Sequence, residues 1–299
     1  MENNTRQTNR EETAQKTKTR AWVMFVLALL IFYFMPILGA AFLLLGPSLT
    51  PANPLLGTGL GELVFGLLAV LAMLLLGGKK WLRFSAKGLR FAFRLSWPLL
   101  AADAALVVWS VIRMLQTGVG VGNVFPALLG AFVFCLGIGL FEETDFRGLL
   151  LNGLLAPLGK SRTWVLLCVI ASSLWFGKVH VGKIDASDTA AFLLAALKIL
   201  QAGCFGVIMC ALVLRTRELG GAFLIHMLHD FMLMSMSVLS GRQATGSYTD
   251  SSSGAAVFIA YGLLLAVILL PTIWAFRSIL RGGDEDHGAF MLPNESKAS

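Results

Sequence analysis

Three clusters of ionisable side chains interrupt long apolar stretches of this sequence, and their residue types are those that proteins use to activate water. The clusters are EETDFR at 142–147, FGKVH at 176–180 and HMLHD at 226–230. An ionisable residue costs about 2.5–3.5 kcal/mol at the centre of a membrane-spanning helix, so such residues usually serve a function. A carboxylate beside an imidazole can hold a water molecule and remove its proton. The three clusters therefore indicate hydrolysis or proton transfer within a membrane.

The spacing in the first cluster predicts one structural pair and one acid that is free for chemistry. Glu143 and Arg147 are four residues apart with the acid first, which is the favourable order for an ion pair on one helix. Glu142 precedes Glu143, so its side chain points about 100° away around a helix. We therefore expect Glu142 to be catalytic and Glu143 and Arg147 to be structural. Asp145 adds a further acid and is expected to support the site.

The other two clusters place imidazoles at helical spacing. Phe176 and His180 are four residues apart and share a helix face, as do His226 and Asp230. His229 follows His226 by three residues and lies on the same broad face. We expect His180, His226 and Asp230 to take part in the chemistry, with Phe176 and His229 in supporting positions.

The same donors would also suit a metal ion. Histidine and carboxylate ligands with one open position are typical of catalytic zinc. The helical zinc signature HExxH is absent, so a zinc site would have to be assembled from several helices, by Glu142, His180, His226 and Asp230. The residues alone leave open whether these four hold zinc or act on water directly.

The composition predicts the elements that carry these residues. Of the 299 residues, 57% are hydrophobic and 14% are charged, whereas soluble domains have about 25% charged residues. One membrane-spanning helix needs about 20 apolar residues. The predicted fold is therefore all-α, a polytopic membrane protein with about eight transmembrane helices, which excludes a soluble enzyme and a secreted disulfide scaffold.

The predicted organisation is a helical transmembrane domain at 21–281 between two polar cytoplasmic tails, a disordered one at 1–20 and another at 282–299. A basic amphipathic stretch at 79–94 is expected to lie along the lipid headgroups. The expected spans are apolar runs at 22–45, 61–76, 97–115, 125–155, 164–180, 189–214, 221–239 and 255–276.

The distribution of Lys and Arg predicts the orientation. With the amino terminus in the cytoplasm, eighteen of these residues fall in inner segments and five, including Lys198, in the outer half. Positive residues gather on the cytoplasmic side, so both termini are expected there. This topology also accounts for the net charge of +7. The expected partner is a lipid bilayer and no nucleic acid.

The three clusters, in this order on successive apolar runs, resemble the CPBP family of intramembrane proteases. This family includes the type II CAAX prenyl endopeptidases and the Abi proteins of bacteriocin processing and immunity. Its EExxxR motif is similar to residues 142–147, its FxxxH motif to 176–180 and its HxxxN motif to 226–230. The resemblance covers a core at about 125–239.

This resemblance implies an integral membrane metalloprotease, of a bacterial plasma membrane, that hydrolyses a peptide bond of a membrane-associated peptide or protein. Glu142 would be the base that activates water and His180 its partner. His226 and residue 230 would bind a metal or stabilise the oxyanion. Two positions depart from the family pattern, because Asp230 replaces the usual asparagine and Asp145 replaces an apolar residue.

Two other classes of function stay open. The fold could serve a non-catalytic immunity or scaffold protein, in which the charged pair only locks helices together. An ion-coupled transporter would also use intramembrane acids and histidines, although no internal repeat of the kind common in transporters is visible.

Overall fold

The computed structural model describes residues 12, 15, 19–31, 33–34, 50, 53–117, 124–158, 161–182, 184, 187–241 and 255–281. The predicted tails at 1–20 and 282–299 lie almost entirely outside these residues, and so does much of the first expected span at 22–45. A short apolar helix, Thr19–Ile31, occupies the described part of that span.

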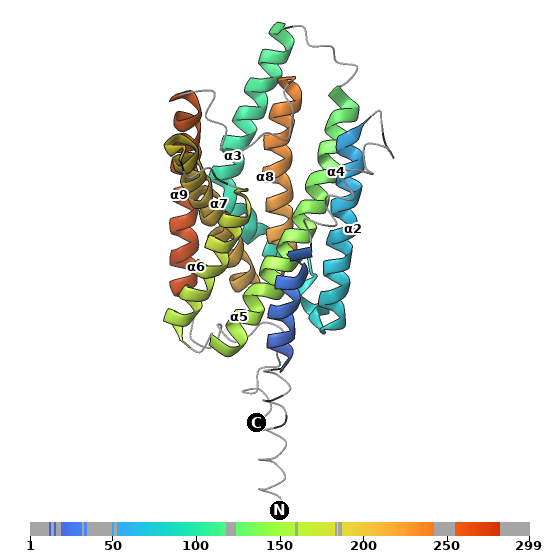
Figure 1. Ribbon diagram of the computed structural model, residues 1–299, viewed down its shortest axis with the longest axis vertical. Helices are drawn as coiled ribbons and strands as arrows, with labels where there is room; N and C mark the ends of the chain where they lie inside the picture. Colours follow the sequence, from blue (N-terminus) through green and yellow to red (C-terminus); the bar gives the residue numbers. More distant parts are fainter. Residues whose placement is uncertain are drawn as a thin grey trace, which may run out of the picture.

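Seven helices in the described part of the chain are long and apolar enough to cross a membrane, which confirms a polytopic all-α protein. They run alternately up and down, so the helix Thr19–Ile31 begins at the same end of the bundle as α9 finishes (Figure 1). The elements are α2 (Pro54–Leu75), η1 (Gly78–Trp81), α3 (Ala86–Thr117), α4 (Val124–Glu142), η3 (Glu143–Leu150), α5 (Leu151–Leu158), α6 (Arg162–Val179), α7 (Thr189–Thr216), α8 (Gly220–Leu239) and α9 (Ala255–Arg281).

Local sequence signals set where several of these helices begin. The side chain of Asn53 accepts a hydrogen bond from the backbone of Leu56 at 3.2 Å, and Pro54 stands at the first helical position of α2. Ser161 caps α6, and Asp188 caps α7 by accepting from two backbone amides at 2.9 and 3.0 Å. These caps fix the start of each helix relative to its apolar run.

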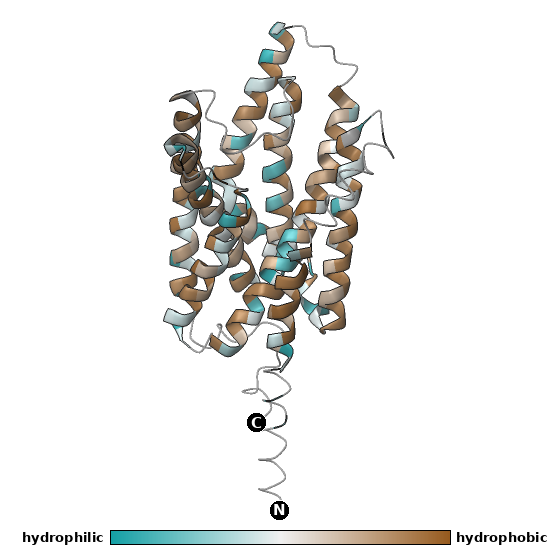
Figure 2. Ribbon diagram, viewed as in Figure 1, coloured by the Kyte–Doolittle hydropathy of each residue, from teal (hydrophilic) through white to brown (hydrophobic). Residues whose placement is uncertain are grey.

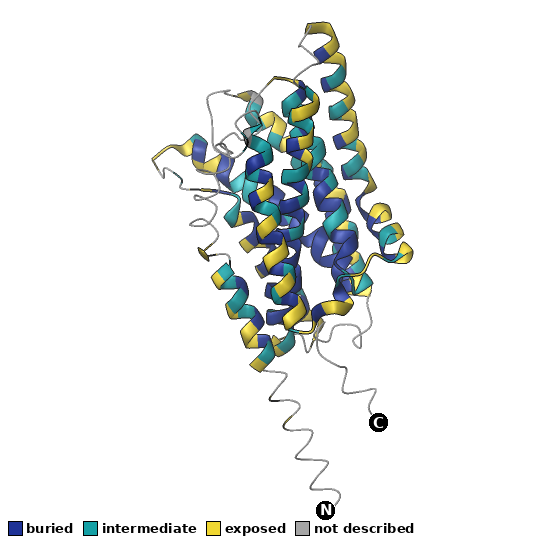
Figure 3. Ribbon diagram, turned by 90° about the vertical axis from the view of Figure 1, so that its right-hand side faces the viewer, coloured by how far each residue is buried: buried dark blue, intermediate teal, exposed yellow. Residues whose placement is uncertain are grey.

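The helices pack as neighbouring pairs, with the buried residues gathered in the interior of the bundle (Figure 3). The packed pairs are α2 with α4, α6 with α7, α7 with α9, α3 with α8, and α4 with α8. Small residues allow two of these close approaches. A Cβ atom at Gly137 would clash with the backbone of α2, and one at Gly177 would clash with the carbonyl oxygen of Ile199 on α7.

The basic stretch predicted to lie along the headgroups is not a separate element. Residues 78–81 form η1, and α3 begins at Ala86 and continues without a break into the third span. Glu218 explains this arrangement, because its carboxylate accepts a hydrogen bond from the backbone of Ser85 at 3.0 Å. The turn between α7 and α8 also donates from the Leu219 backbone to Trp81 at 2.8 Å. These bonds tie the start of α3 to that turn.

The fourth expected span is continuous but not uniformly α-helical. The eight residues of η3 form a π-helix between α4 and α5, and this segment contains Glu143 and Arg147. A π-helix shifts its backbone hydrogen bonds by one residue, which changes the direction of the side chains on either side. The buried amide of Asn152 donates to the carbonyl oxygens of Arg147 at 3.2 Å and Gly148 at 2.7 Å, which supports this backbone.

Candidate active site

A cavity of about 460 Å³ lies among five helices of the bundle. Hydrophilic residues interrupt the apolar helices on α8 and where α4 passes into η3 (Figure 2). Most of the cavity wall is apolar or aromatic. Its polar lining residues are Glu142 from α4, His180 from the end of α6, Lys198 and Gln201 from α7, His226, His229, Asp230 and Ser237 from α8, and Tyr261 from α9.

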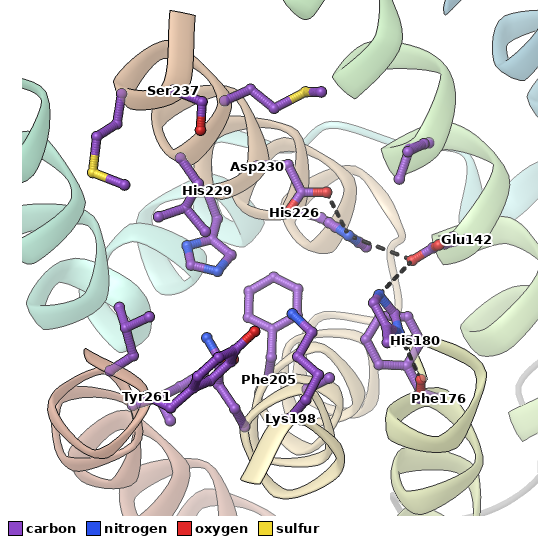
Figure 4. Close-up of a pocket in the computed structure, with 18 of the residues that line it drawn as sticks. Glu142, Phe176, His180, Lys198, Phe205, His226, His229, Asp230, Ser237 and Tyr261 are labelled. Atoms are coloured by element: carbon purple, nitrogen blue, oxygen red, sulfur yellow. Dashed lines mark hydrogen bonds and ion pairs between the residues drawn. The ribbon is translucent and has the colours of Figure 1, made fainter. Parts of the chain in front are cut away.

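Two predicted catalytic imidazoles, those of His180 and His226, converge on a carboxylate oxygen of the third predicted residue, Glu142 (Figure 4). Oε2 of Glu142 lies 3.9 Å from Nε2 of His180 and 3.6 Å from Nε2 of His226. This oxygen is buried and has no hydrogen-bond partner among the described residues. A separation of 3.6–3.9 Å is too long for a direct hydrogen bond but suits groups that share a water molecule or a substrate atom.

The ring of His180 is oriented by the backbone of its own helix. Its Nδ1 lies 2.7 Å from the carbonyl oxygen of Phe176, and a carbonyl oxygen can only accept, so Nδ1 carries the proton of this bond. His180 follows the last helical residue of α6. This position leaves Nε2 directed at Glu142 with its lone pair available.

His226 is held by the structural pair of the first cluster. Arg147 donates to Oε1 of Glu143 at 2.9 Å, which confirms the predicted ion pair. The same oxygen accepts a hydrogen bond from Nδ1 of His226 at 2.6 Å. The side chains of Glu143, Arg147 and His226 are each no more than 2% exposed. Glu143 therefore orients His226, and Nε2 of this ring faces the cavity.

The two residues that depart from the family pattern have different positions. Oδ2 of Asp230 lies 3.3 Å from Nε2 of His226, so these two share a helix face as expected. Asp230 lines the cavity, with 30% of its side chain exposed. Asp145 is buried and is not among the described residues that line the cavity. Of the two, only Asp230 adds a carboxylate to the cavity wall.

Aromatic rings hold the clusters together. The guanidinium group of Arg147 lies 4.2 Å from the centre of the Phe176 ring, an arrangement typical of cation–π attraction. Phe176 also contacts the rings of His180 at 4.5 Å and His226 at 5.9 Å. The phenylalanine of the second cluster thus joins all three clusters at one point, which is a role that spacing alone could not reveal.

A metal site is the alternative use of these donors. No group of three or more His, Cys, Asp or Glu side chains among them is arranged to hold a metal ion. Nδ1 of His226 donates to Glu143, and its Nε2 lies 3.3 Å from the carboxylate of Asp230. These side chains lie close to one another, an arrangement in which they can act on water directly.

Three residues of interest did not emerge from the sequence as site residues. Asp103 of α3 is buried and accepts a hydrogen bond from Nδ1 of His229 at 2.7 Å. Lys198, which the charge distribution assigned to the outer half, lies within α7 and lines the cavity. Phe205 of α7 packs between the rings of His226 and His229, at 5.0 and 4.9 Å. A lone acid and a lone lysine in apolar runs were the available signals for the first two.

Comparison with known proteins agrees with the motifs. Residues 123–232 match the family model described as Rce1-like, type II CAAX prenyl endopeptidase. No curated protein and no solved structure matches this chain. The matched segment runs from the start of α4 into α8 and includes the three clusters. Residues 123–232 of this integral membrane protein therefore carry a domain of the Rce1-like type II CAAX prenyl endopeptidase family, which confirms the family that the three clusters predicted.

Proposed function

We propose that this protein is an intramembrane endopeptidase in which Glu142 and His180 activate a water molecule. The substrate would be a membrane-associated peptide or protein, and the site of cleavage would lie inside the bundle. One observation carries this proposal, namely that a buried carboxylate oxygen of Glu142 lies within 4 Å of imidazole nitrogens from two other helices. Such an arrangement has the parts for general-base catalysis.

In the proposed first step, Glu142 takes a proton from a water molecule held between its Oε2 and Nε2 of His180. The oxygen of this water attacks the carbonyl carbon of the scissile bond. A tetrahedral intermediate forms with negative charge on the former carbonyl oxygen. A donor near that oxygen would stabilise it, as an oxyanion hole does. We assign this role to Nε2 of His226, which lies 3.6 Å from Glu142.

Asp230 takes a different role from the asparagine of the family motif. A carboxylate cannot donate a hydrogen bond to an oxyanion unless it is protonated. Its Oδ2 lies 3.3 Å from Nε2 of His226. We assign Asp230 to holding His226 in the protonated form from which it donates to the substrate.

The cavity has the size and lining for a short extended stretch of peptide. Its volume of about 460 Å³ is within the range of about 300–1,000 Å³ typical of small-molecule sites. The apolar wall, which includes Phe134, Ile138 and Leu264, would bind apolar side chains next to the scissile bond. These features support a substrate with hydrophobic residues at the cleavage site.

The test is cleavage by purified protein in proteoliposomes that contain a library of membrane-anchored reporter peptides. We expect the wild type to cleave some of them and Glu142→Gln to lose at least about 10²-fold in rate. Glu62→Gln is the matched control. Glu62 is another intramembrane glutamate with a buried oxygen that has no hydrogen-bond partner among the described residues, and it is not among those that line the cavity. Full activity in Glu142→Gln would disprove the proposed mechanism.

If the wild type cleaves no reporter, the non-catalytic alternative is favoured. An immunity or scaffold role would then be tested in cells, by asking whether Glu142→Gln keeps the phenotype while the protein stays in the membrane. A coupled transporter would instead show counterflow of substrate across the proteoliposome membrane.

A further inference from the structure

Helix α8 presents two imidazoles to the bundle, and each is held by a carboxylate from another helix. Nδ1 of His226 lies 2.6 Å from Glu143, and Nδ1 of His229 lies 2.7 Å from Asp103. The first pair belongs to the proposed hydrolysis. The pair of His229 with Asp103 has no role in the steps proposed above. Asp103 lies on α3, outside the segment that matches the family model.

The Asp103–His229 pair is deeply buried. Asp103 is 1% exposed near the middle of α3, and His229 is 6% exposed. A carboxylate in the middle of a span is costly, and it persists where it has a partner and a task. By accepting the proton of Nδ1, Asp103 holds the ring of His229 in one orientation, as the aspartate of a catalytic triad does.

The ring of His229 lies in the catalytic cavity. It lines the same cavity as Glu142, and the view of the site shows it on the side away from that residue (Figure 4). It stacks on Phe205 at 4.9 Å with the ring planes 28° apart. Because Nδ1 is engaged by Asp103, Nε2 is the nitrogen left to meet a bound molecule. The cavity thus has a water-activating side, with His180 and His226, and a third imidazole, that of His229, on the other side.

Hydrolysis of a peptide bond also needs a proton donor for the leaving nitrogen, which can be the base that took the proton from water or a second group. The leaving nitrogen of an amide must receive a proton as the carbon–nitrogen bond breaks, because an amine does not leave as an anion in water. Glu142 and His180 act on the attacking water, and His226 acts on the oxyanion. None of these three proposed roles supplies the leaving nitrogen with a proton.

We propose that His229 donates this proton and that Asp103 positions it, an inference that rests on the proposed function. As the tetrahedral intermediate collapses, the carbonyl double bond re-forms and the carbon–nitrogen bond breaks. The nitrogen takes the proton from Nε2 of His229, so a carboxylic acid and a neutral amine leave. The proton that Glu142 took from water then returns to His229 through solvent. The net reaction consumes one water and regenerates both residues.

The experiment compares two matched substrates that differ only in the scissile bond, one an amide and the other a thioester, built on a reporter peptide that the wild type cleaves. A thiol has an ordinary pKa of about 8.5, so a thiolate leaves without a proton. We expect His229→Gln to lower kcat for the amide by about 10²-fold and to leave kcat for the thioester within about threefold. Asp103→Asn should show the same selectivity, with KM unchanged for both substrates.

The matched control is Ser96→Ala, which removes another buried polar side chain from α3 and should leave both rates unchanged. An equal loss on amide and thioester, or a rise in KM alone, would show that the pair only supports the fold or binds substrate, and would overturn the proposal. Unchanged amide cleavage in His229→Gln would also overturn it. If Glu142→Gln is inactive and His229→Gln is not, this inference fails while the proposed function stands.

The wild-type protein offers a second test that needs no folded variant. Anilide substrates with leaving amines of different basicity should be cleaved at similar rates if the leaving nitrogen is protonated as it departs. A steep increase in rate with better leaving groups would mean that no proton is supplied, and would contradict a donor at His229.

Discussion

Two adjacent glutamates illustrate how position decides the role of a residue. Glu143 is 1% exposed and contacts both Arg147 and His226 at hydrogen-bonding distance. Glu142 is 15% exposed, lines the cavity and has an oxygen without a hydrogen-bond partner among the described residues. The first acid has the partners that stabilise a buried charge, whereas the second has the open position that chemistry requires.

This difference predicts opposite effects of the same substitution. Glu143→Gln should lower thermal stability strongly, because breaking a buried ion pair typically costs about 3–5 kcal/mol. Glu142→Gln should leave stability unchanged or raise it, since Oε2 of Glu142 has no hydrogen-bond partner to lose among the described residues. Thermal unfolding of the two variants in the same detergent would measure this contrast. Equal destabilisation by both would contradict the separation of roles.

Whether the catalytic side chains act with or without a metal ion can also be tested. If Glu142 and His180 activate water without a metal, as proposed, reporter cleavage should persist in EDTA and 1,10-phenanthroline. The metal content of purified protein should be well below one ion per chain. Stoichiometric zinc that is lost in His226→Ala would show instead that the side chains rearrange to form the zinc site considered from the sequence.

Among the elements, the contact between α6 and α7 helps to set the position of His180 in the site. His180 follows the end of α6, and Gly177 lets the backbone of this helix approach Ile199 of α7. A methyl group at Gly177 would push the helices apart and move His180 relative to Glu142. The position of one catalytic imidazole therefore depends on a residue that has no chemical function.

We accordingly expect Gly177→Ala to lower the cleavage rate at least tenfold and to cost about 1–3 kcal/mol of stability. Gly182→Ala is the matched control, because a Cβ atom there has no neighbour within 4 Å. Rates and thermal unfolding of both variants would test this expectation. Normal activity in Gly177→Ala would mean that the site tolerates displacement of α6.

The whole molecule makes a prediction about orientation. The basic residues near η1 and the start of α3 lie at the same end of the bundle as the finish of α9 (Figure 1). If this end faces the cytoplasm, an exposed cysteine at Lys79 should resist a membrane-impermeant thiol reagent in intact cells, and one at Ser240 should react. Three of the four native cysteines are buried, which keeps the background low. The reverse pattern would invert the topology.

Much of this architecture could be predicted from the sequence, because a bilayer demands long apolar helices and penalises charges within them. That penalty makes Glu142, His180, His226 and Asp230 stand out, and helical spacing alone predicts the pair of Glu143 with Arg147. The π-helical geometry of η3 was not predicted, since no apolar period encodes it. The continuous start of α3 was also missed, because it depends on a bond between Ser85 and Glu218, which are distant in the sequence.

By itself, the sequence determined the all-α membrane class, the order of the spans and the residue types available for chemistry. Only the tertiary structure decided which imidazole faces which carboxylate, because those distances depend on how helices from distant parts of the chain pack and rotate. Asp103 shows this most clearly. In the sequence it is a single acid in an apolar run, and it became part of the site only when α3 packed against α8 and brought it within 2.7 Å of His229.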